Sequence, residues 1–415
     1  MPNNWKTHKL GDIAEIKGGK RLPKGDVLIS NITNHPYIRV TDMGTRNIPI
    51  EKVQYVPEDV FPKISRYIVN TNDLILSIVG TVGSVSIIDK KLDNASLTEN
   101  CVKITNLKEV DYLFLYYYLI SDIGQFEISK GIVGSTQPKL PIYNINDLEI
   151  VLPEKKQEQQ SIASILSAID DKIENNLAIN KTLEEMAMAL YKHWFVDFGP
   201  FQDGEFVESK LGMIPKGWEV KKITELIEVK DGTHDSPKRV EEGHFLITSK
   251  HMTGNSIDFS SAYKVSFEDF TKINKRSLVE KGDILMTMIG TVGNFYFVNE
   301  EPNYVIKNIG LFKTSKAPEL QSYFYSYFKS KIGQEYIKAQ MTGSTQQYVT
   351  LNTLRNFDII IPNKQTLTSF NQVTNDYFET IMLNTKENQT LTQLRDTLLP
   401  KLISGEVRLK EFKEN

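Results

Sequence analysis

The chain has 415 residues, of which 40% are hydrophobic and 24% are charged, and its formal net charge is −3. This composition is typical of a globular protein long enough for two to four domains, and it argues against a protein that holds nucleic acid by bulk positive charge. No apolar run reaches the roughly 18–20 residues of a membrane span, and a single cysteine, Cys101, excludes an internal disulfide and a multi-thiolate metal site. We therefore expect a cytoplasmic protein in which Cys101 is a small buried residue.

The first predicted domain covers residues 1–153 and is rich in strands. Its opening segment ends in a glycine turn at Gly18 and Gly19. Residues 74–79 form a short apolar run bounded by turn residues, which predicts a buried strand. Residues 112–119 are rich in aromatic side chains, and we interpret them as a helix packed on the sheet rather than as a surface for base stacking.

The next predicted element is a long helix over residues 154–197. Its apolar residues recur at alternating steps of four and three, which is the seam of a coiled coil, and the middle of this seam carries Asn176 and Asn180. At 1.5 Å per residue, a helix of about 40 residues makes a rod of about 60 Å, which suits a spacer. Residues 198–215 are acidic and punctuated by glycine and proline, so we expect a linker whose aromatic side chains pack on the helix ends.

The second predicted domain, residues 216–362, repeats the first. The Gly-Thr-Val-Gly motif of residues 80–83 returns at residues 290–293, and the Gly-Ser-Thr-Gln motif of residues 134–137 returns at residues 343–346. These offsets of 210 and 209 residues are far longer than the roughly 20–50 residues of a solenoid repeat. The chain therefore contains two related half-molecules.

A second long helix with a C-terminal tail is predicted over residues 363–415. Its seam carries Asn384 and Asn388 at the positions that match Asn176 and Asn180. In an antiparallel helix pair the midpoints meet, so the four asparagines could face one another and fix the register. The alternative is that they lie at the wet edge of the seam.

These elements predict an α+β fold with an internal pseudo-twofold repeat. Two similar strand-rich α/β domains are separated by two long antiparallel coiled-coil helices. The first domain carries 17 basic and 17 acidic side chains, and the second carries 19 and 17. Any basic surface must therefore be a local cluster within one of the two domains.

Several motifs, in this order and duplicated, resemble one known family. They are Leu-Tyr-Lys-His-Trp-Phe-Val-Asp-Phe at residues 190–198, Asp-Gly-Thr-His-Asp-Ser-Pro-Lys at residues 231–238, the two Gly-Ser-Thr-Gln blocks, and Leu-Arg-Asp-Thr-Leu-Leu-Pro-Lys-Leu-Ile-Ser-Gly-Glu at residues 394–406. Over essentially its whole length the chain resembles the specificity subunit of type I restriction–modification enzymes.

The resemblance implies a division of labour. Each target-recognition domain would read one half of a split double-stranded DNA sequence, and the helices would set the gap between the halves. The helices would also recruit two methyltransferase subunits, to which restriction and translocase subunits can be added. It implies no catalytic residue, no metal and no cofactor in this chain, with S-adenosylmethionine, ATP and Mg expected on the partner subunits, and no membrane partner.

Base reading uses forked donors, whereas phosphate binding uses lysine, arginine or backbone amides. The candidates for DNA contact are basic residues clustered near turns: Lys17, Lys20, Arg21, Lys24, Arg39, Arg46, Lys230, Lys238, Arg239, Lys250, His251, Lys275 and Arg276, with Lys272 beside the last two. The alternative for each of them is solvated surface charge.

The repeated polar motifs allow two interpretations. Either they cap turns, or they contact DNA or the methyltransferase subunit. The residues concerned are Ser135, Thr136, Gln137, Ser344, Thr345 and Gln346. The Gly-Thr-Val-Gly motifs lack the spacing and the Lys-Ser/Thr ending of a nucleotide-binding loop, so we interpret them as tight turns. His234 has no second ligand at metal-binding spacing.

Two other classes of function stay open from the sequence. A DNA methyltransferase with its own target domain would need a cofactor loop and an Asn/Asp-Pro-Pro-aromatic motif, but the chain has no Pro-Pro dipeptide. A metal-dependent nuclease would need clustered carboxylates with a lysine, which we do not find in both halves. A structural coiled-coil scaffold fits the near-neutral charge, but it does not explain two large and different domains.

Overall fold

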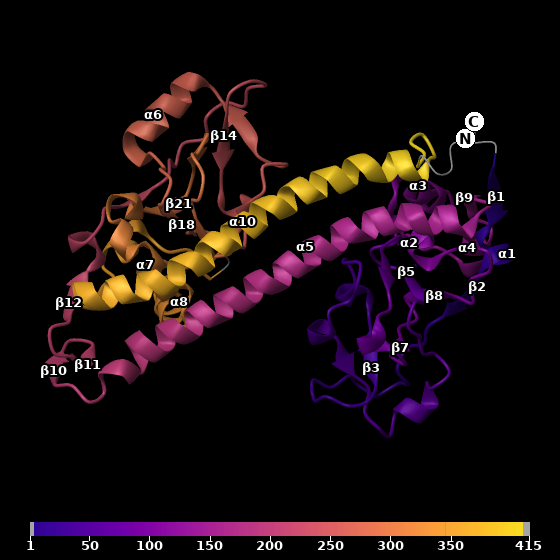
Figure 1. The fold of residues 1–415 in the computed structure, drawn as a ribbon, viewed down its shortest axis with the longest axis horizontal. Helices are drawn as coiled ribbons and strands as arrows, with labels where there is room; N and C mark the ends of the chain where they lie inside the picture. Colours follow the sequence, from indigo (N-terminus) through magenta and orange to yellow (C-terminus); the bar gives the residue numbers. More distant parts are fainter. Residues whose placement is uncertain (1–3, 345, 410–415) are drawn as a thin grey trace. The chain divides into compact units, whose positions relative to one another are not determined.

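The computed structural model describes residues 4–344 and 346–409, which form two compact units. Of the described residues, the first unit comprises 4–173 and 390–409, and the second comprises 174–344 and 346–389. Each unit holds one strand-rich domain and one part of each of two long helices, α5 (Lys156–Tyr191) and α10 (Lys364–Ile403) (Figure 1).

The first domain contains a central four-stranded sheet and a smaller three-stranded sheet. The central sheet has the order β2-β8-β5-β6, the smaller sheet has the order β4-β3-β7, and β1 pairs with β9. The strands are β1 (Trp5–Lys9), β2 (Glu15–Gly18), β3 (Pro36–Ile38), β4 (Gln54–Tyr55), β5 (Leu74–Ser77), β6 (Val85–Ile87), β7 (Ser96–Leu97), β8 (Cys101–Thr105) and β9 (Glu149–Pro153). Strand β5 is fully buried, which confirms the strand predicted at residues 74–79.

Four helices accompany these sheets: α1 (Leu10–Ile13), α2 (Tyr112–Ile120), α3 (Asp122–Lys130) and α4 (Ile142–Asn146). The aromatic helix predicted at residues 112–119 is α2. It begins at the cap Asp111, whose carboxylate accepts hydrogen bonds from the backbone amides of Leu113 and Phe114. The side chains of Phe114 and Tyr117 are fully buried in the core that α2 shares with the central sheet, so the aromatic residues serve packing.

The second domain repeats this topology. Its central sheet has the order β13-β21-β18-β19, its smaller sheet has the order β17-β14-β20, and β12 pairs with β22. The strands are β12 (Glu219–Lys222), β13 (Val229–Asp231), β14 (His244–Ile247), β15 (Met252–Thr253), β16 (Ser256–Ile257), β17 (Tyr263–Val265), β18 (Ile284–Thr287), β19 (Phe295–Phe297), β20 (Tyr304–Ile306), β21 (Ile309–Phe312) and β22 (Asp358–Ile361).

Four helices belong to the second domain: α6 (Phe267–Ser277), α7 (Gln321–Lys329), α8 (Lys331–Ala339) and α9 (Leu351–Arg355). Helix α7 is the counterpart of α2, and its aromatic side chains are buried against the sheet. Helix α6, on the side of the domain away from α10, separates β17 from β18 (Figure 1). In the first domain the corresponding stretch, between β4 and β5, has a short 3₁₀ turn at Phe61–Lys63 in place of this helix. The duplicated α+β architecture predicted from the sequence is confirmed, and the two copies differ mainly around the smaller sheet.

Within each unit the two long helices run antiparallel. In the first unit, Arg395 Nη1 of α10 lies 3.0 Å from Asp170 Oδ1 of α5. In the second unit, Asn176 Nδ2 donates to Asn388 Oδ1 at 2.9 Å, and Asn384 Nδ2 donates to Asn180 Oδ1 at 2.8 Å. Residue numbers fall along α10 as they rise along α5.

The four asparagines therefore form two cross-helix pairs. Asn176 is fully buried and Asn180 is 7% exposed. Asn176 Nδ2 also donates to Glu387, and Asn180 Nδ2 donates to the Ile381 carbonyl. A buried amide without such partners would cost free energy, so these contacts favour this alignment of the helices.

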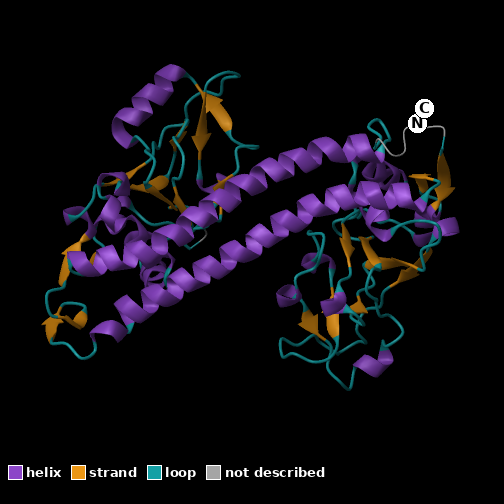
Figure 2. Cartoon of the chain, viewed as in Figure 1, coloured by secondary structure: helices purple, strands orange, loops and turns teal. Residues whose placement is uncertain are grey.

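Helix α5 ends in an aromatic cluster. A π-helical turn, Lys192–Val196, brings Phe195 to 5.8 Å from Trp218, measured between ring centroids, and Phe201 lies 5.0 Å from the same ring. The predicted packing of the linker aromatics is thus present. The linker also contains an unpredicted hairpin, β10 (Phe206–Ser209) with β11 (Gly212–Pro215), which Figure 2 draws as two strands beside the end of α5.

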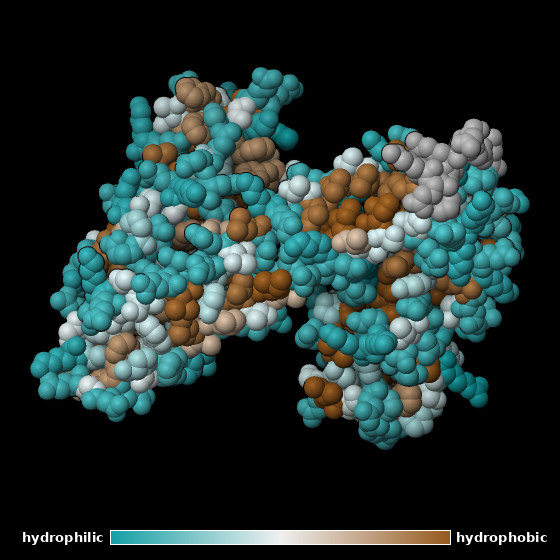
Figure 3. Space-filling view, viewed as in Figure 1, coloured by the Kyte–Doolittle hydropathy of each residue, from teal (hydrophilic) through white to brown (hydrophobic). Residues whose placement is uncertain are grey.

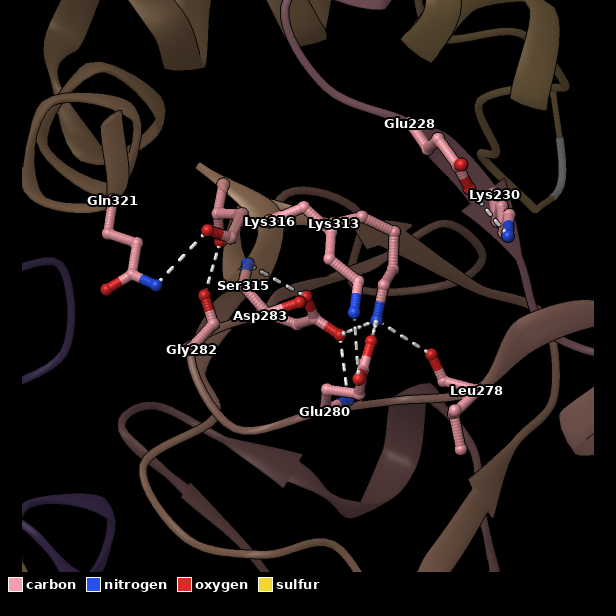
Figure 4. A network of polar contacts seen from close by, with 11 residues as sticks. Glu228, Lys230, Leu278, Glu280, Gly282, Asp283, Lys313, Ser315, Lys316 and Gln321 are labelled. Carbon is pink, nitrogen blue, oxygen red and sulfur yellow. Dashed lines mark hydrogen bonds and ion pairs between the residues drawn. The ribbon is translucent and has the colours of Figure 1, made fainter. Parts of the chain in front are cut away.

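Each domain has an internal ion pair at the aspartate that directly precedes β5 or β18. In the second domain Lys313 Nζ lies 2.5 Å from Asp283 Oδ2 and 2.7 Å from Glu280 Oε2, and it also donates to the Leu278 carbonyl (Figure 4). In the first domain Lys103 Nζ lies 3.6 Å from Asp73 Oδ2. The side chain of Asp283 is completely buried, so this carboxylate depends on the lysine for charge compensation.

Candidate nucleic-acid interface

In the first domain, two loops leave the central sheet at the same edge. Strands β2 and β5 are both antiparallel to β8, and Gly18 and Leu76 both pair with Val102. The two strands therefore run parallel to each other and end together. The loop that follows β2 carries the predicted basic cluster, and the loop that follows β5 carries the first Gly-Thr-Val-Gly motif.

The second domain has the same arrangement. Asp231 of β13 and Met286 of β18 both pair with Gly310 of β21. The Asp-Gly-Thr-His-Asp-Ser-Pro-Lys segment and the second Gly-Thr-Val-Gly motif consequently leave one edge of this sheet. We refer to this part of each domain as the loop edge: residues 19–26, 78–83 and 133–139 in the first domain, and residues 232–240, 288–293 and 342–348, without residue 345, in the second.

A closely packed glycine begins the basic loop in each domain. The Lys20 amide donates to the Leu97 carbonyl at 2.7 Å, and the Thr233 amide donates to the Ile306 carbonyl at 3.0 Å. A Cβ atom on Gly19 would lie 2.0 Å from the Thr98 carbonyl oxygen, and one on Gly232 would lie 2.3 Å from the Ile306 oxygen. Only glycine lets the chain pass this close to the smaller sheet.

The basic residues of the first loop are exposed but partly engaged. Lys17 pairs with Glu15, and Arg21 pairs with Glu99 at 2.5 Å. The Lys20 ammonium lies 5.9 Å from the centroid of the Tyr67 ring, and Lys24 is exposed. Surface ion pairs of this kind contribute little free energy, so these side chains can exchange their partners for DNA phosphates at low cost.

The structure places the other two arginine candidates of the first domain in internal contacts. Arg39 binds Asp42 with two nitrogens and donates to Gln54 at 2.6 Å. Arg46 pairs with Asp171 of α5 and is only 10% exposed, which joins the smaller sheet to the helix. Both guanidinium groups therefore stabilise the fold of the first unit.

In the second domain two distant basic clusters come together. A groove of about 810 Å³ lies between the loop of residues 233–240 and helix α6. Lys238, Lys272 and Arg276 line it together with Asp235 and Asp269. Lys275 and Arg239 are exposed nearby in the sequence, and Lys230 pairs with Glu228 at 2.6 Å.

Buried Asp231 organises this groove. It forms an ion pair with Arg276 and a polar contact with His234, whose Nε2 lies 3.0 Å from Asp231 Oδ2. The other ring nitrogen of His234 lies 2.7 Å from Asn308 Oδ1. His234 thus holds the loop in place, which is a role the sequence did not suggest.

The last two candidates, Lys250 and His251, differ in exposure. Lys250 is exposed, whereas His251 is 1% exposed and its Nδ1 accepts a hydrogen bond from the Thr248 amide at 2.9 Å. Burial and the neighbouring Lys250 lower the pKa of His251. We therefore leave His251 out of the proposed DNA contacts.

The two repeated motifs of each domain form one double loop. Val79 and Val133 both bridge to Lys139, and Ile289 and Thr342 both bridge to Tyr348. Five of the six polar candidates are described, and all five are exposed on these double loops: Ser135, Thr136, Gln137, Ser344 and Gln346. Thr345 lies outside the described residues. The glycines Gly80 and Gly290 have φ of +83° and +79°, as the predicted tight turns require.

The sequence could not reveal which residues hold the loop edge together. Asp231, Asn308 and the carbonyl groups beside Gly19 and Gly232 act through contacts between strands distant in sequence. One signal was available, namely glycine at the same place in both halves. The resulting surface combines uncharged donors with a few cations, which suits binding to a polyanion that also presents hydrogen-bonding edges.

We expect Gly19→Ala to disturb the loop edge of the first domain. The added methyl group would overlap the Thr98 carbonyl, so the loop must shift, at a cost of about 1–3 kcal/mol in the free energy of unfolding. Hydrogen exchange of the Lys20 amide should accelerate. Gly18→Ala is the matched control, because its Cβ would meet only the Ile142 side chain at 3.5 Å. Equal exchange in both variants would contradict the expectation.

Neither a metal-ligand cluster nor a membrane-spanning helix is found in the part of the chain that the structure describes. Among residues 4–344 and 346–409, no group of three or more histidine, cysteine and carboxylate side chains could hold a metal ion. No helix within the same residues is long and apolar enough to cross a membrane. Burial raises the pKa of Cys101 to about 12, as expected for an unreactive core thiol.

Comparison with known proteins agrees with this geometry. The family described as the type I restriction modification DNA specificity domain matches twice, over residues 2–185 and 215–393. The MjaIX specificity subunit of Methanocaldococcus jannaschii is 29% identical over 99% of this chain and 95% of its own length. The HindI specificity subunit of Haemophilus influenzae is 23% identical over 98% of this chain and 100% of its own length.

A crystal structure of the type I restriction–modification S subunit from M. genitalium has the same fold, with a TM-score of 0.60 at 21% identity. The alignment covers 97% of each chain. Two matched domains, each with its own loop edge and each followed by a long helix, account for nearly all of the sequence. The chain belongs to the type I restriction–modification DNA specificity family and contains two copies of its domain.

Proposed function

We infer that this chain is the DNA sequence-specificity subunit of a type I restriction–modification system. The observation that carries the inference is the loop edge, which occurs twice on the same frame but with different residues in its basic loop. Each target-recognition domain contacts one half of a bipartite DNA sequence. Because the loops differ, the two half-sites differ as well.

The DNA contacts divide by chemistry. Lysines on the exposed loops, such as Lys20, Lys24 and Lys238, bind phosphates and position the domain. Forked donors such as Arg21, Arg239 and Arg276 suit base edges in the major groove. Each domain has nearly equal numbers of basic and acidic side chains, so binding by the isolated chain is weak and strongly salt-dependent.

The long helices recruit the catalytic partners. In the second unit they leave large apolar side chains exposed, including Leu177 at 57% and Leu383 at 69%, and Figure 3 draws apolar surface along the helices. Exposed apolar residues on a helix pair suit packing against helices of another subunit. We propose two methyltransferase subunits as partners, with restriction and translocase subunits added to them.

Catalysis resides in those partners. In this proposal the chain contributes no catalytic residue and binds no cofactor of its own, while S-adenosylmethionine, ATP and Mg act on the partner subunits. The protein acts where the host DNA is, in the cytoplasm. Methyl transfer by the purified chain alone would favour the alternative of a methyltransferase with its own target domain.

The decisive experiment is a domain exchange. Residues 216–362 are replaced by the corresponding segment of another family member, and the methylated sites of the host genome are mapped with either version and with the gene deleted. We expect deletion to remove one bipartite site and the exchange to change only one of its halves. A change in both halves would contradict the division into two domains, and unchanged methylation would favour a structural scaffold.

A further inference from the structure

The double loops of the two domains are held by the same contacts. In the first domain the Ser77 hydroxyl accepts from the Ser84 amide at 2.9 Å and donates to the Thr81 carbonyl. In the second domain the Thr287 hydroxyl does the same with Asn294, at 2.9 Å, and with Thr291. A hydroxyl group at the end of the central strand thus closes each Gly-Thr-Val-Gly turn.

A glutamine from the helix behind each loop completes this support. Gln125 Nε2 donates to the Gly83 carbonyl at 3.0 Å and to the Leu119 carbonyl at 2.8 Å. Gln334 Nε2 donates to the Gly293 carbonyl at 3.1 Å and to the Phe328 carbonyl at 2.8 Å. The loops are therefore preorganised, so little conformational entropy is lost when they bind a ligand.

Internal support does not explain the side chains that point outward. Thr81, Ser135 and Gln137 are exposed, and so are their counterparts Thr291, Ser344 and Gln346. The closing contacts use backbone carbonyls of this region, together with Ser77, Thr287 and the two glutamines from the helices. The same exposed side chains nevertheless occur in both copies, although the neighbouring basic loops differ.

The exposed threonine, serine and glutamine side chains of the double loop recur in both domains, whereas the basic loop beside it differs. This suggests that the two loops contact different chemical groups of the same DNA. Bases differ between two half-sites, whereas the sugar–phosphate backbone is the same at both. Hydroxyl and amide side chains and backbone amides supply many of the hydrogen bonds that proteins make to DNA phosphates. The double loop shares its sheet edge with the cationic loop, which favours DNA over a protein partner as its ligand.

Building on the proposed function, we propose that each double loop binds phosphodiester groups of one half-site and positions the domain without reading its sequence. The loop of residues 78–83 and 133–139 serves one half-site, and the loop of residues 288–293, 342–344 and 346–348 serves the other. The variable basic loop beside each of them reads the bases.

The test uses the chain assembled with its methyltransferase subunits. Ser135→Ala with Gln137→Ala removes the donors of the first double loop, and Ser344→Ala with Gln346→Ala removes those of the second. The probes are a duplex carrying the methylated sequence and a scrambled duplex of equal composition. Ser129→Ala, at an exposed serine of α3 whose hydroxyl donates to the Phe126 carbonyl, is the control.

We expect each double variant to lower the affinity for both duplexes by about tenfold, as for the loss of a hydrogen bond to a charged group. The methylated sequence and the amount of bound methyltransferase should not change. The salt dependence should also stay the same, because uncharged donors release no counterions, whereas Lys238→Ala should reduce its slope by about one.

The proposal would be overturned if the double variants kept their DNA affinity, or if they lost methyltransferase from the complex. It would also be overturned if affinity fell for the specific duplex alone or if the methylated sequence changed. If the unaltered complex failed to prefer the specific duplex, the proposed function itself would be wrong. The two failures are therefore distinguishable in one set of measurements.

Discussion

Replacing Lys313 by methionine should lower the free energy of unfolding of the second domain by about 3–5 kcal/mol. The Lys313 ammonium compensates Asp283, whose side chain has no exposed surface, and it also contacts Glu280 and the Leu278 carbonyl (Figure 4). Methionine keeps the length of the side chain but leaves the buried carboxylate without a counter-charge. The loss would be measured by urea unfolding and by hydrogen exchange of the backbone amides in strands β18 and β21.

Two further variants identify the cause. Lys316→Met removes a neighbouring ammonium that also pairs with Glu280 but is 66% exposed, so it should cost less than about 1 kcal/mol. Adding Asp283→Leu to Lys313→Met should restore much of the lost stability, because no unpaired charge remains. If Lys313→Met and Lys316→Met lowered the free energy of unfolding equally, the buried ion pair would stabilise the domain no more than the exposed one.

The ion pair of the equivalent aspartate in the first domain, Asp73, gives an internal comparison. Lys103 lies 3.6 Å from Asp73, and their side chains are 15% and 7% exposed. The longer distance and greater exposure leave more water near both charges, so the same substitution at Lys103 should cost less. The repeat thus preserves the aspartate, but its lysine comes from within β8 in the first domain and from just after β21 in the second.

The repeat and the long helices could be predicted because their signals extend over many residues. Two motifs at almost the same offset defined the duplication, and a seam of apolar residues defined helices α5 and α10. Such periodic segments fold largely as their local pattern dictates. The buried strand β5 was predictable from an apolar run bounded by turn residues, and helix α2 from its aromatic residues.

The smaller sheets could not be predicted. Their strands have two to four residues, which is too short to show a period, and β3–β7 and β14–β20 are parallel pairs joined by long connections. The linker hairpin is similarly short, and helix α6 was predicted only as a basic cluster of Lys272, Lys275 and Arg276. Contacts between residues distant in sequence decide these elements.

The same limit applies to the candidate interface. Basic residues can be counted in a sequence, but their partners cannot. Arg46 pairs with a carboxylate 125 residues away, and His251 is buried although it follows an exposed lysine. Arg276 and Lys238 line one groove only because α6 packs beside the loop that follows β13. Separating fold-stabilising from exposed cations therefore required the structure.

The asparagine pairs allow a test of the expectation that the helices set the gap in the DNA site. Helices α5 and α10 each pass from one unit to the other, at residues 173–174 and 389–390. On one side of this boundary Asp170 pairs with Arg395, and on the other side Asn176 pairs with Asn388. Residues added to both helices at the boundary would leave both sets of contacts in place.

We expect a four-residue insertion in both helices, after Ile173 and before Thr390, to widen the gap in the methylated sequence by one or two base pairs. Four residues add about 6 Å of helix, and one base pair occupies about 3.4 Å. The half-sites themselves should not change. Insertion in α5 alone cannot keep both the Asp170–Arg395 and the Asn176–Asn388 contacts, so it should lower the unfolding temperature instead. A folded double-insertion variant that methylates the original sequence would rule out the helices as the element that sets the gap.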